Sequence, residues 1–278
     1  MILDGKKMAE TVTNEVKVEV TENNYDITLA LIMVGNNPAS EVYVRNKQKA
    51  CDNVGIKVES HFLDEEITQN ELLTIIEKCN KDQKINGILV QMPLPKHLNE
   101  DSIINAIDPK KDVDGLTYIN QGKLMAGQDT IPSATPKGVI TLLKKNNIEI
   151  SGKNVVIVGR SILVGKPLAL LFLQNNATVT ICHSKTNNLK EITKNADILV
   201  AAIGKPKYFT SDMVKEGAVV IDVGINRVDG KLCGDVDFDN VSEKASFITP
   251  VPKGVGPMTI ASLLENIVTC YKMQNKIL

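Results

Sequence analysis

Four short apolar runs in the second half of the chain recur at roughly 20-residue intervals, which is the length of one strand, one helix and their turns in a parallel α/β fold. The runs are VVIVG (155–159), TVTIC (178–182), DILVAA (197–202) and AVVIDVG (218–224). Short continuous apolar segments suit strands that are buried on both faces. The spacing therefore predicts a Rossmann-like, doubly wound parallel sheet in this part of the chain.

The first half also alternates between helical and strand patterns. Met8, Val12, Val16 and Val20 recur every four positions and predict one apolar helix face. The apolar run TLALIMV (28–34) predicts a buried strand. Further strands are predicted at KVESHFL (57–63) and GILVQMP (87–93). The expected fold class is therefore α/β throughout, in two lobes.

Short polar signals predict where three of the helices begin. Ser40, after the loop GNNPAS, is expected to be an N-cap because its hydroxyl can accept a hydrogen bond from the first turn. Thr68 and Glu71 have the spacing of a capping box. Thr135 and Pro136 have the residue types preferred at the N-cap and the first helical position.

The junction between the lobes is expected where the periodicity weakens. Between Pro95 and about Pro136, turn-forming residues accumulate and no regular pattern persists. We therefore predict one domain at 1–118 and a second at 119–278. The last segment, 257–278, is expected to form a helix that packs back on the first domain.

Composition narrows the classes of partner. The chain has 278 residues, 43% of them hydrophobic, and this is enough for a substantial core. Its 32 basic and 33 acidic residues give no long-range attraction for nucleic acid or anionic membranes. No signal peptide and no apolar run of about 18 residues is visible, so a cytoplasmic protein acting on a small molecule is expected. The five cysteines include no CxxC pair, and neither disulfides nor a metal site are predicted.

A candidate phosphate-binding turn follows the strand VVIVG. The sequence GRSILVGKP places Gly159 at the end of that strand and Gly165 at the start of a helix. Backbone N–H groups and the helix dipole can meet an anion at such a turn. Arg160 and Ser161 occupy the interior, so the segment is not the GxGxxG fingerprint. An ordinary strand-to-helix turn explains the motif about as well.

The residues after the second strand of this half favour NADP over NAD. An NAD site commonly has a carboxylate there, which binds the ribose 2′-hydroxyl. Here the strand is followed by His183, Ser184, Lys185 and Thr186. Together with Arg160, this basic and hydroxylic cluster suits a 2′-phosphate. The alternative is a solvated turn.

Candidate chemical residues lie in three segments of the first lobe. Tyr43 and Lys47 are four residues apart and so share a helix face. A lysine amine partly shielded from water can act as an acid or a base. Gln91 interrupts an apolar strand near its carboxyl end, and Asp112 and Asp114 lie in KKDVDG. Each has a plain alternative: an exposed lysine, an amide bonded to loop backbone, and an Asx turn.

Several segments together resemble the bifunctional methylenetetrahydrofolate dehydrogenase/cyclohydrolase family. The matching segments are YVRNKQKA, GILVQMPLP, KDVDGL, TPKG, VVIVGRSILVGKP, ATVTICHSKT, DVGIN, GDVDF and PVPKGVGPMT. They follow the family order over nearly the whole chain, and their joint occurrence is highly specific. The resemblance implies an N-terminal folate-binding catalytic domain and a C-terminal NADP-binding domain. It also implies NADP-dependent oxidation of 5,10-methylenetetrahydrofolate and hydrolysis of the methenyl product to 10-formyltetrahydrofolate.

The resemblance also implies roles for individual residues. Lys47 is expected to be the central acid–base residue, and Gln91 is expected to hydrogen-bond its amine. Tyr43 is expected to stack along the folate, and Asp114 is expected to bind the pterin end. Residues expected to bind NADP are Gly159, Arg160, Ser161, Gly165, Ser184 and Ile225. Residues expected to bind the folate are Tyr43, Gln91, Pro93, Leu94, Asp114, Gly256 and Pro257.

One residue departs from the family pattern. The last segment usually resembles PVPGGVGPMT, and Lys253 here replaces the first glycine of the pair. A lysine adds strain if this position needs a positive φ, and it adds a charge if the position faces the folate.

Other interpretations remain open at this stage. They are a monofunctional dehydrogenase, a two-lobe dehydrogenase resembling shikimate dehydrogenase, and a catalytically silent NADP-binding regulator. KDVDGL and PVPKGVGPMT argue against the second, and the presence of Lys47 argues against the third. By resemblance, a homodimer that serves one-carbon metabolism and purine biosynthesis is expected.

Overall fold

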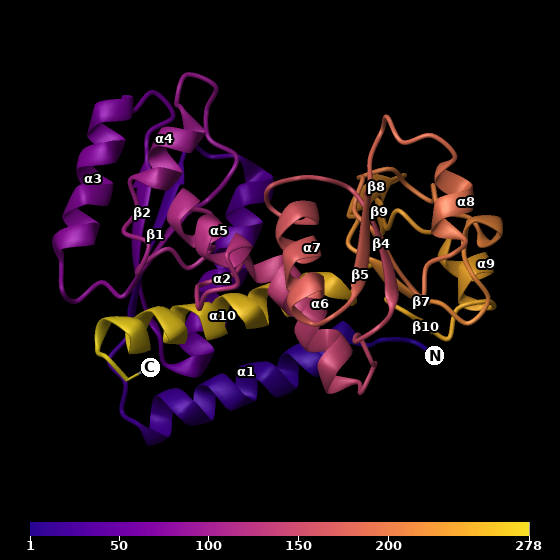
Figure 1. The fold of residues 1–278 in the computed structure, drawn as a ribbon. Coiled ribbons are helices and arrows are strands. Elements are labelled where there is room, and N and C mark those ends of the chain that lie inside the picture. Colours follow the sequence, from indigo (N-terminus) through magenta and orange to yellow (C-terminus); the bar gives the residue numbers. More distant parts are fainter. Residues whose placement is uncertain (278) are drawn as a thin grey trace. The chain divides into compact units, whose positions relative to one another are not determined.

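The structure is a computed structural model that describes residues 1–277, and it divides into two compact α/β units (Figure 1). The first unit comprises residues 11–134 together with the chain from 260 onward. The second unit comprises residues 1–10 and 135–259. The predicted two-lobed α/β fold is therefore confirmed. Among the described residues, no helix is long and apolar enough to cross a membrane.

The first unit contains a three-stranded parallel sheet in the order β2-β1-β3. Its strands are β1 (Thr28–Val34), β2 (Lys57–Leu63) and β3 (Gly87–Val90). Its helices include α2 (Pro38–Val54), α3 (Gln69–Lys81), α4 (Glu100–Asn105) and α5 (Tyr118–Met125). The units share α1 (Gly5–Glu22) and α10 (Val255–Gln274), which the division crosses after residues 10 and 259.

Strand β1 forms the centre of the first unit because its alternate side chains point to opposite faces of the sheet. Odd-numbered side chains at 29–33 join a core cluster with Leu264 and Ile267 of α10. Even-numbered side chains at 30–34 join a second cluster with Ile76 of α3, which lies alongside the strands (Figure 1). Two buried faces account for the continuous apolar run TLALIMV.

The second unit contains a five-stranded sheet in the order β10-β7-β6-β4-β5, with all neighbouring strands parallel. The strands are β4 (Asn154–Val158), β5 (Thr178–Cys182), β6 (Ile198–Ala201), β7 (Val219–Asp222) and β10 (Phe247–Ile248). The helical segments are α6 (Ala134–Lys145), which begins at the division between the units, α7 (Gly165–Gln174), α8 (Leu189–Thr193), α9 (Phe238–Ser242) and the 3₁₀ turn η1 (Ser211–Met213). The first four strands confirm the predicted spacing. The order reverses direction between β4 and β6, where doubly wound sheets bind ligands.

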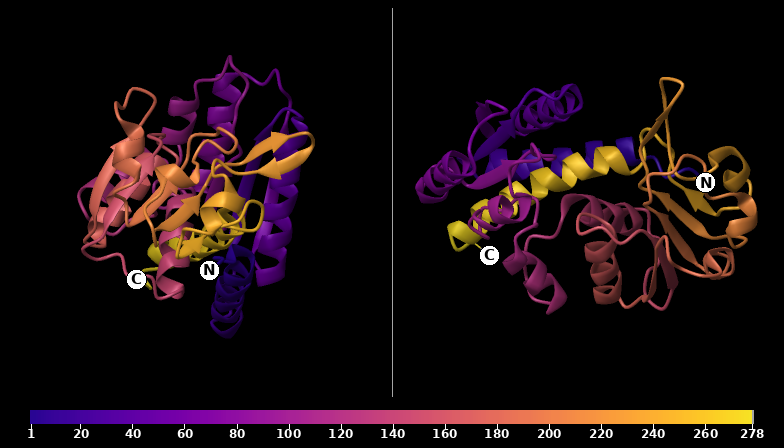
Figure 2. Two further views of the ribbon diagram at one scale, coloured as in Figure 1. Left: turned by 90° about the vertical axis from the view of Figure 1, so that its right-hand side faces the viewer. Right: turned by 90° about the horizontal axis from the view of Figure 1, so that it is seen from above.

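Two features of the second unit were not predicted from the sequence. An antiparallel hairpin of β8 (Asn226–Val228) and β9 (Lys231–Cys233) projects from the unit (Figure 2). The N-terminus extends the sheet edge, because Leu3 N–H donates to the Ile248 carbonyl at 2.8 Å and Ile248 N–H donates to the Met1 carbonyl at 3.0 Å.

The helix starts differ in how well they match the expectations. The capping box is confirmed: Glu71 N–H donates to Thr68 Oγ1, and Thr68 N–H donates to Glu71 Oε2. Ser40 is not an N-cap, because α2 begins at Pro38 and Ser40 N–H donates to Asn37 Oδ1 at 3.3 Å.

The predicted start at Thr135 and Pro136 is also wrong, because α6 begins at Ala134. Pro136 is tolerated in the third helical position because N–H groups of the first turn have no partner within the helix. A proline in the sequence therefore predicts that a helix begins within about one turn, but it does not predict the residue at which the helix begins.

Candidate functional site

In the first unit, the structure brings Lys47 and Gln91 together. Lys47 lies on α2, and Gln91 directly follows β3. Lys47 Nζ donates to Gln91 Oε1 at 3.2 Å, and both side chains are half-buried. The Gln91 amide nitrogen donates to the Met92 carbonyl at 2.7 Å, so the amide oxygen is turned toward the amine. The strand end thus holds an acceptor against a lysine that is partly shielded from water.

Asp114 belongs to the same group of residues. Burial raises the pKa of the Asp114 carboxyl, the nearby positive charge of Lys47 opposes this rise, and the negative charge of Asp112 adds to it. The effect of Lys47 requires the two side chains to lie near each other. Lys47, Gln91 and Asp114, predicted from separate segments, therefore form one local cluster.

A buried lysine that was not predicted from the sequence supports the segment that carries Asp114. Lys111 is 4% exposed, and its Nζ donates to the carbonyls of Cys79, Asn80 and Asp82 at 3.0, 2.8 and 2.7 Å. These carbonyls lie at the end of α3, where backbone acceptors have no partner within the helix. Lys111 thus joins the KKDVDG segment to the end of α3. Its contacts are non-local, and only its place in that motif could have drawn attention to it.

Asp112 and Gly115 fix the two sides of Asp114. Asp112 is buried, and its Oδ2 accepts from Thr117 N–H at 2.8 Å and from Asn120 Nδ2 at 2.9 Å. Gly115 has φ +65°, and a Cβ there would collide with the Ile131 carbonyl. Asp114 is therefore presented by a turn whose neighbours on both sides are fixed.

The other predicted folate-binding residues of this unit differ in exposure. Tyr43 is 48% exposed and lies one helical turn before Lys47 on α2. Pro93 is exposed and follows a cis peptide bond. Leu94 is 8% exposed and packs in the core cluster of α3 and α4. If Leu94 binds the folate, it therefore does so through its backbone groups and not through its side chain.

In the second unit, two glycines shape the predicted phosphate turn. Gly159 follows β4 with φ +137°, and a Cβ there would collide with the Ala202 carbonyl. A Cβ at Gly165, the first residue of α7, would collide with the Gly159 carbonyl. Ser161 Oγ accepts from Val164 N–H at 3.1 Å and closes the turn. The start of α7 therefore lies directly against the strand end, and a side chain at either glycine would collide with the backbone.

The segment after β5 can receive a second phosphate. His183 N–H donates to Thr186 Oγ1 at 2.8 Å, and Lys185 N–H donates to His183 Nδ1 at 3.1 Å. Arg160, Ser184 and Lys185 are exposed, and residues 183–190 contain no carboxylate. A charged and hydroxylic turn of this kind fits the 2′-phosphate of NADP better than the free hydroxyls of NAD.

The remaining predicted residues share a cavity of about 250 Å³ in the second unit. Its lining includes Ile225, Lys253, Gly256 and Pro257. Lys253 has φ +81° and is exposed. The position that departs from the family pattern therefore does have the backbone conformation that favours glycine.

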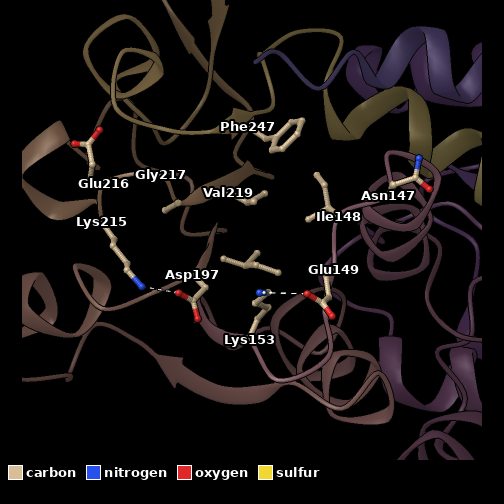
Figure 3. A pocket seen from close by; sticks show the side chains of 12 residues that line it. Asn147, Ile148, Glu149, Lys153, Asp197, Lys215, Glu216, Gly217, Val219 and Phe247 are labelled. Atoms are coloured by element: carbon tan, nitrogen blue, oxygen red, sulfur yellow. Dashed lines mark hydrogen bonds and ion pairs between the residues drawn. The ribbon is translucent and has the colours of Figure 1, made fainter.

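A second cavity, of about 340 Å³, lies at the amino ends of the strands of the five-stranded sheet (Figure 3). Its two ammonium groups already have partners: Lys215 Nζ lies 2.6 Å from Asp197 Oδ1, and Lys153 Nζ lies 3.4 Å from Glu149 Oε2. None of the predicted site residues lines this cavity. Within the described part of the chain, no group of three or more His, Cys, Asp and Glu residues could hold a metal ion.

Comparisons with known proteins match both halves of the chain. Residues 3–114 match the model of the tetrahydrofolate dehydrogenase/cyclohydrolase catalytic domain, and residues 133–275 match that of the family's NAD(P)-binding domain. The bifunctional protein FolD of Agathobacter rectalis is 57% identical over 275 residues, which cover 98% of this chain and 99% of that protein.

Solved structures give the same result. The crystal structure of the FolD methylenetetrahydrofolate dehydrogenase/cyclohydrolase of Campylobacter jejuni has a TM-score of 0.96 and 48% identity, covering 98% of this chain and 99% of that one. The Trypanosoma brucei methylenetetrahydrofolate dehydrogenase-cyclohydrolase, solved with NADP cofactor and an inhibitor, has a TM-score of 0.93 and 36% identity, covering 99% and 98%. With both domain models matched in order and a full-length relative above half identity, the chain belongs to the tetrahydrofolate dehydrogenase/cyclohydrolase family.

Proposed function

We propose that the chain is a bifunctional enzyme that oxidises 5,10-methylenetetrahydrofolate with NADP⁺ and hydrolyses the methenyl product to 10-formyltetrahydrofolate. The observation that carries this proposal is the hydrogen bond between Lys47 Nζ and Gln91 Oε1, within the unit that matches the catalytic-domain model. It places an amine with a fixed amide partner beside a half-buried carboxyl. The similarity to bifunctional FolD proteins supports both activities.

The residues of the first unit suit the hydrolysis step. Lys47 in its neutral form takes a proton from the water that attacks the methenyl carbon. The resulting ammonium then gives a proton to N5 of the folate as the bond between N5 and that carbon breaks. Gln91 orients the amine because its amide nitrogen donates to the Met92 carbonyl, and this bond turns the amide oxygen toward Lys47. Asp114 binds the pterin end, and Tyr43 offers its ring as a stacking surface one turn along α2.

The second unit provides the binding site for NADP. When bound, NADP would accept the hydride, and the backbone N–H groups at the start of α7, beside Gly159 and Gly165, would hold its diphosphate. Arg160, Ser161 and Ser184 would meet the phosphate oxygens, and Ile225 would lie against the nicotinamide. We assign folate binding to residues 1–118 and NADP binding to residues 119–278 on the same grounds.

The experiment measures the two activities separately on the purified chain. NADPH absorbance follows methylenetetrahydrofolate oxidation, and the decay of methenyltetrahydrofolate without nucleotide follows hydrolysis. The proposal expects both activities, and it expects NADP⁺ to be preferred to NAD⁺. Oxidation without hydrolysis would show that the chain is a monofunctional dehydrogenase. The absence of both activities would refute the assignment.

We also propose a cytoplasmic homodimer whose product supports purine biosynthesis. The near-balanced charge, which gives no attraction to anionic membranes, supports the location. The family resemblance supports the dimer. Sedimentation at micromolar concentration tests it, and a monomer throughout that range would contradict it.

A further inference from the structure

A buried carboxylate on the segment after the β8–β9 hairpin holds the loop that follows β6. Asp235 is fully buried. Its carboxylate accepts three successive backbone hydrogen bonds, from Ile203 N–H at 2.7 Å, Gly204 N–H at 3.0 Å and Lys205 N–H at 2.7 Å. Three charge-assisted bonds to consecutive amides fix the course of a loop that regular secondary structure does not fix.

The same carboxylate also holds the loop that follows β7. Asn226 Nδ2 donates to Asp235 Oδ1 at 2.9 Å. Gly224 passes so close that a Cβ there would collide with the carboxyl of Asp235. Ile225, assigned above to the nicotinamide, lies between these two residues in the chain. Asp235 therefore joins the loops at the carboxyl ends of two neighbouring strands.

Asp235 is itself fixed by a second buried carboxylate. Asp222 ends β7, and its Oδ1 accepts from Asp235 N–H at 3.0 Å while its Oδ2 accepts from Val236 N–H at 2.9 Å. A Cβ at Gly234 would collide with Asp222 Oδ2. The segment that carries Asp235 is thus positioned by direct contact with the strand end.

The order of the strands shows which part of the nucleotide these loops would meet. The candidate 2′-phosphate turn follows β5, and the diphosphate turn follows β4. An extended dinucleotide that runs from β5 across β4 reaches β6 and β7 next, so its nicotinamide half lies over the loops that Asp235 joins. The first of these loops follows Ala202, whose carbonyl lies against Gly159.

We propose that Asp235 is a positioning residue for NADP: it holds the loops at 203–205 and 224–226 in the arrangement that receives the nicotinamide half. The inference rests on the proposed function, because it presupposes that this edge of the sheet binds NADP. Asp235 acts through the two loops and is not itself a catalytic residue. Its fourfold acceptor role requires a carboxylate, because all four groups that face it are N–H donors.

The test replaces Asp235 by asparagine, which preserves shape. Each carboxylate oxygen accepts two N–H donors, so either orientation of the amide puts its NH₂ group against two of them. We expect the KM for NADP⁺ to rise by about tenfold to a hundredfold, the range that follows from losing charge-assisted bonds. The nucleotide-independent hydrolysis of methenyltetrahydrofolate is expected to stay within about twofold of wild type, given the error of such comparisons.

A milder variant and a matched control complete the experiment. Asn226→Ala removes one of the four bonds and leaves the buried carboxylate in place, and it should raise the KM for NADP⁺ by about threefold to tenfold. Asp239→Asn changes an exposed carboxylate on α9 and should change neither activity. If Asp235→Asn does not fold, Asn226→Ala decides the question.

The results separate failure of the inference from failure of the proposed function. A wild-type chain without NADP-dependent activity refutes the function. An active wild type with an unchanged KM for NADP⁺ in folded Asp235→Asn, or in Asn226→Ala where the first variant does not fold, overturns the inference alone. An equal loss of both activities also overturns it, because that result indicates general structural damage.

Discussion

The two units use buried carboxyl groups in opposite ways. In the first unit, Asp114 is half-buried near the amine of Lys47, and we propose that its side chain itself binds the substrate. In the second unit, Asp222 and Asp235 bond mainly to backbone N–H groups and hold loops. We therefore expect chemistry in the first unit to depend on side chains and recognition in the second unit to depend on the course of the backbone. Substitutions in the two units should therefore damage different activities.

The largest effect is expected at Lys47. Lys47→Ala removes the proposed acid–base amine and should lower the rate of methenyltetrahydrofolate hydrolysis by about a hundredfold to ten-thousandfold. NADP⁺ binding, measured by calorimetry, should stay unchanged because the residues that we propose bind the nucleotide lie in the other unit. Lys49→Ala, at an exposed position two residues along the same helix, is the control and should behave as wild type. A hydrolysis rate within tenfold of wild type in Lys47→Ala would contradict the claim that the side chain of Lys47 carries the chemistry of the first unit.

Asp114→Asn should have the next largest effect. Removing the carboxylate that we propose binds the pterin should raise the KM for the folate substrate by about tenfold or more, the cost of a hydrogen bond to a charged group. Steady-state kinetics at saturating NADP⁺ measure this change. Asp101→Asn, an exposed carboxylate of α4, is the control.

The pH dependence of folate binding tests the coupling between Lys47 and Asp114. Lys47 holds down the pKa of Asp114, which burial otherwise raises. Lys47→Ala should therefore shift the titration that controls folate binding to higher pH. A profile that does not move would show that the two groups are not coupled.

Asp222 predicts a pH dependence of stability. Burial raises its pKa from 3.8 to about 7. The folded state therefore keeps a proton that the unfolded state loses between these values, and stability falls as pH rises through that window. The full shift would lower the free energy of unfolding by at most about 4 kcal/mol across this pH window, since one pKa unit corresponds to about 1.4 kcal/mol.

Urea unfolding of the full chain between about pH 5 and about pH 8 measures this dependence. Asp222→Asn should flatten the profile, although it also lowers stability because the amide's NH₂ group must face a backbone N–H donor. A profile in the variant that is as steep as wild type would assign the dependence to another group. A flat wild-type profile would refute the raised pKa.

The sequence predicted best those features that repeat locally. The runs at β4 to β7 and the capping box at Thr68 are confirmed because periodicity and cap spacing act over a few residues. The starts of α2 and α6 were misplaced because Pro38 and Pro136 permit several positions in the first turn.

The contacts that fix the loops were not predictable in the same way. Asp235 bonds to amides about 30 residues away in the chain, and Lys111 reaches the end of a helix at a similar separation. Such contacts leave no period in the sequence. Two signals point to them in retrospect: Asp222 ends an otherwise apolar strand, and glycine precedes Asp235 in GDVDF.

The smallest predicted effect concerns Lys253, where backbone conformation and residue type disagree. Lys253→Gly relieves a φ of +81°, which costs a residue with a Cβ about 1 kcal/mol or more, but it also adds freedom to the unfolded chain. The net expectation is a gain of about 1 kcal/mol or less, measured by thermal unfolding. Lys194→Gly, at φ −60° in the same unit, should lower stability instead, because glycine there relieves nothing. Equal changes in stability in the two variants would show that the backbone conformation of Lys253 carries no strain. The backbone at this position would then accept a side chain, unlike the backbone at Gly224, where a Cβ would collide with Asp235.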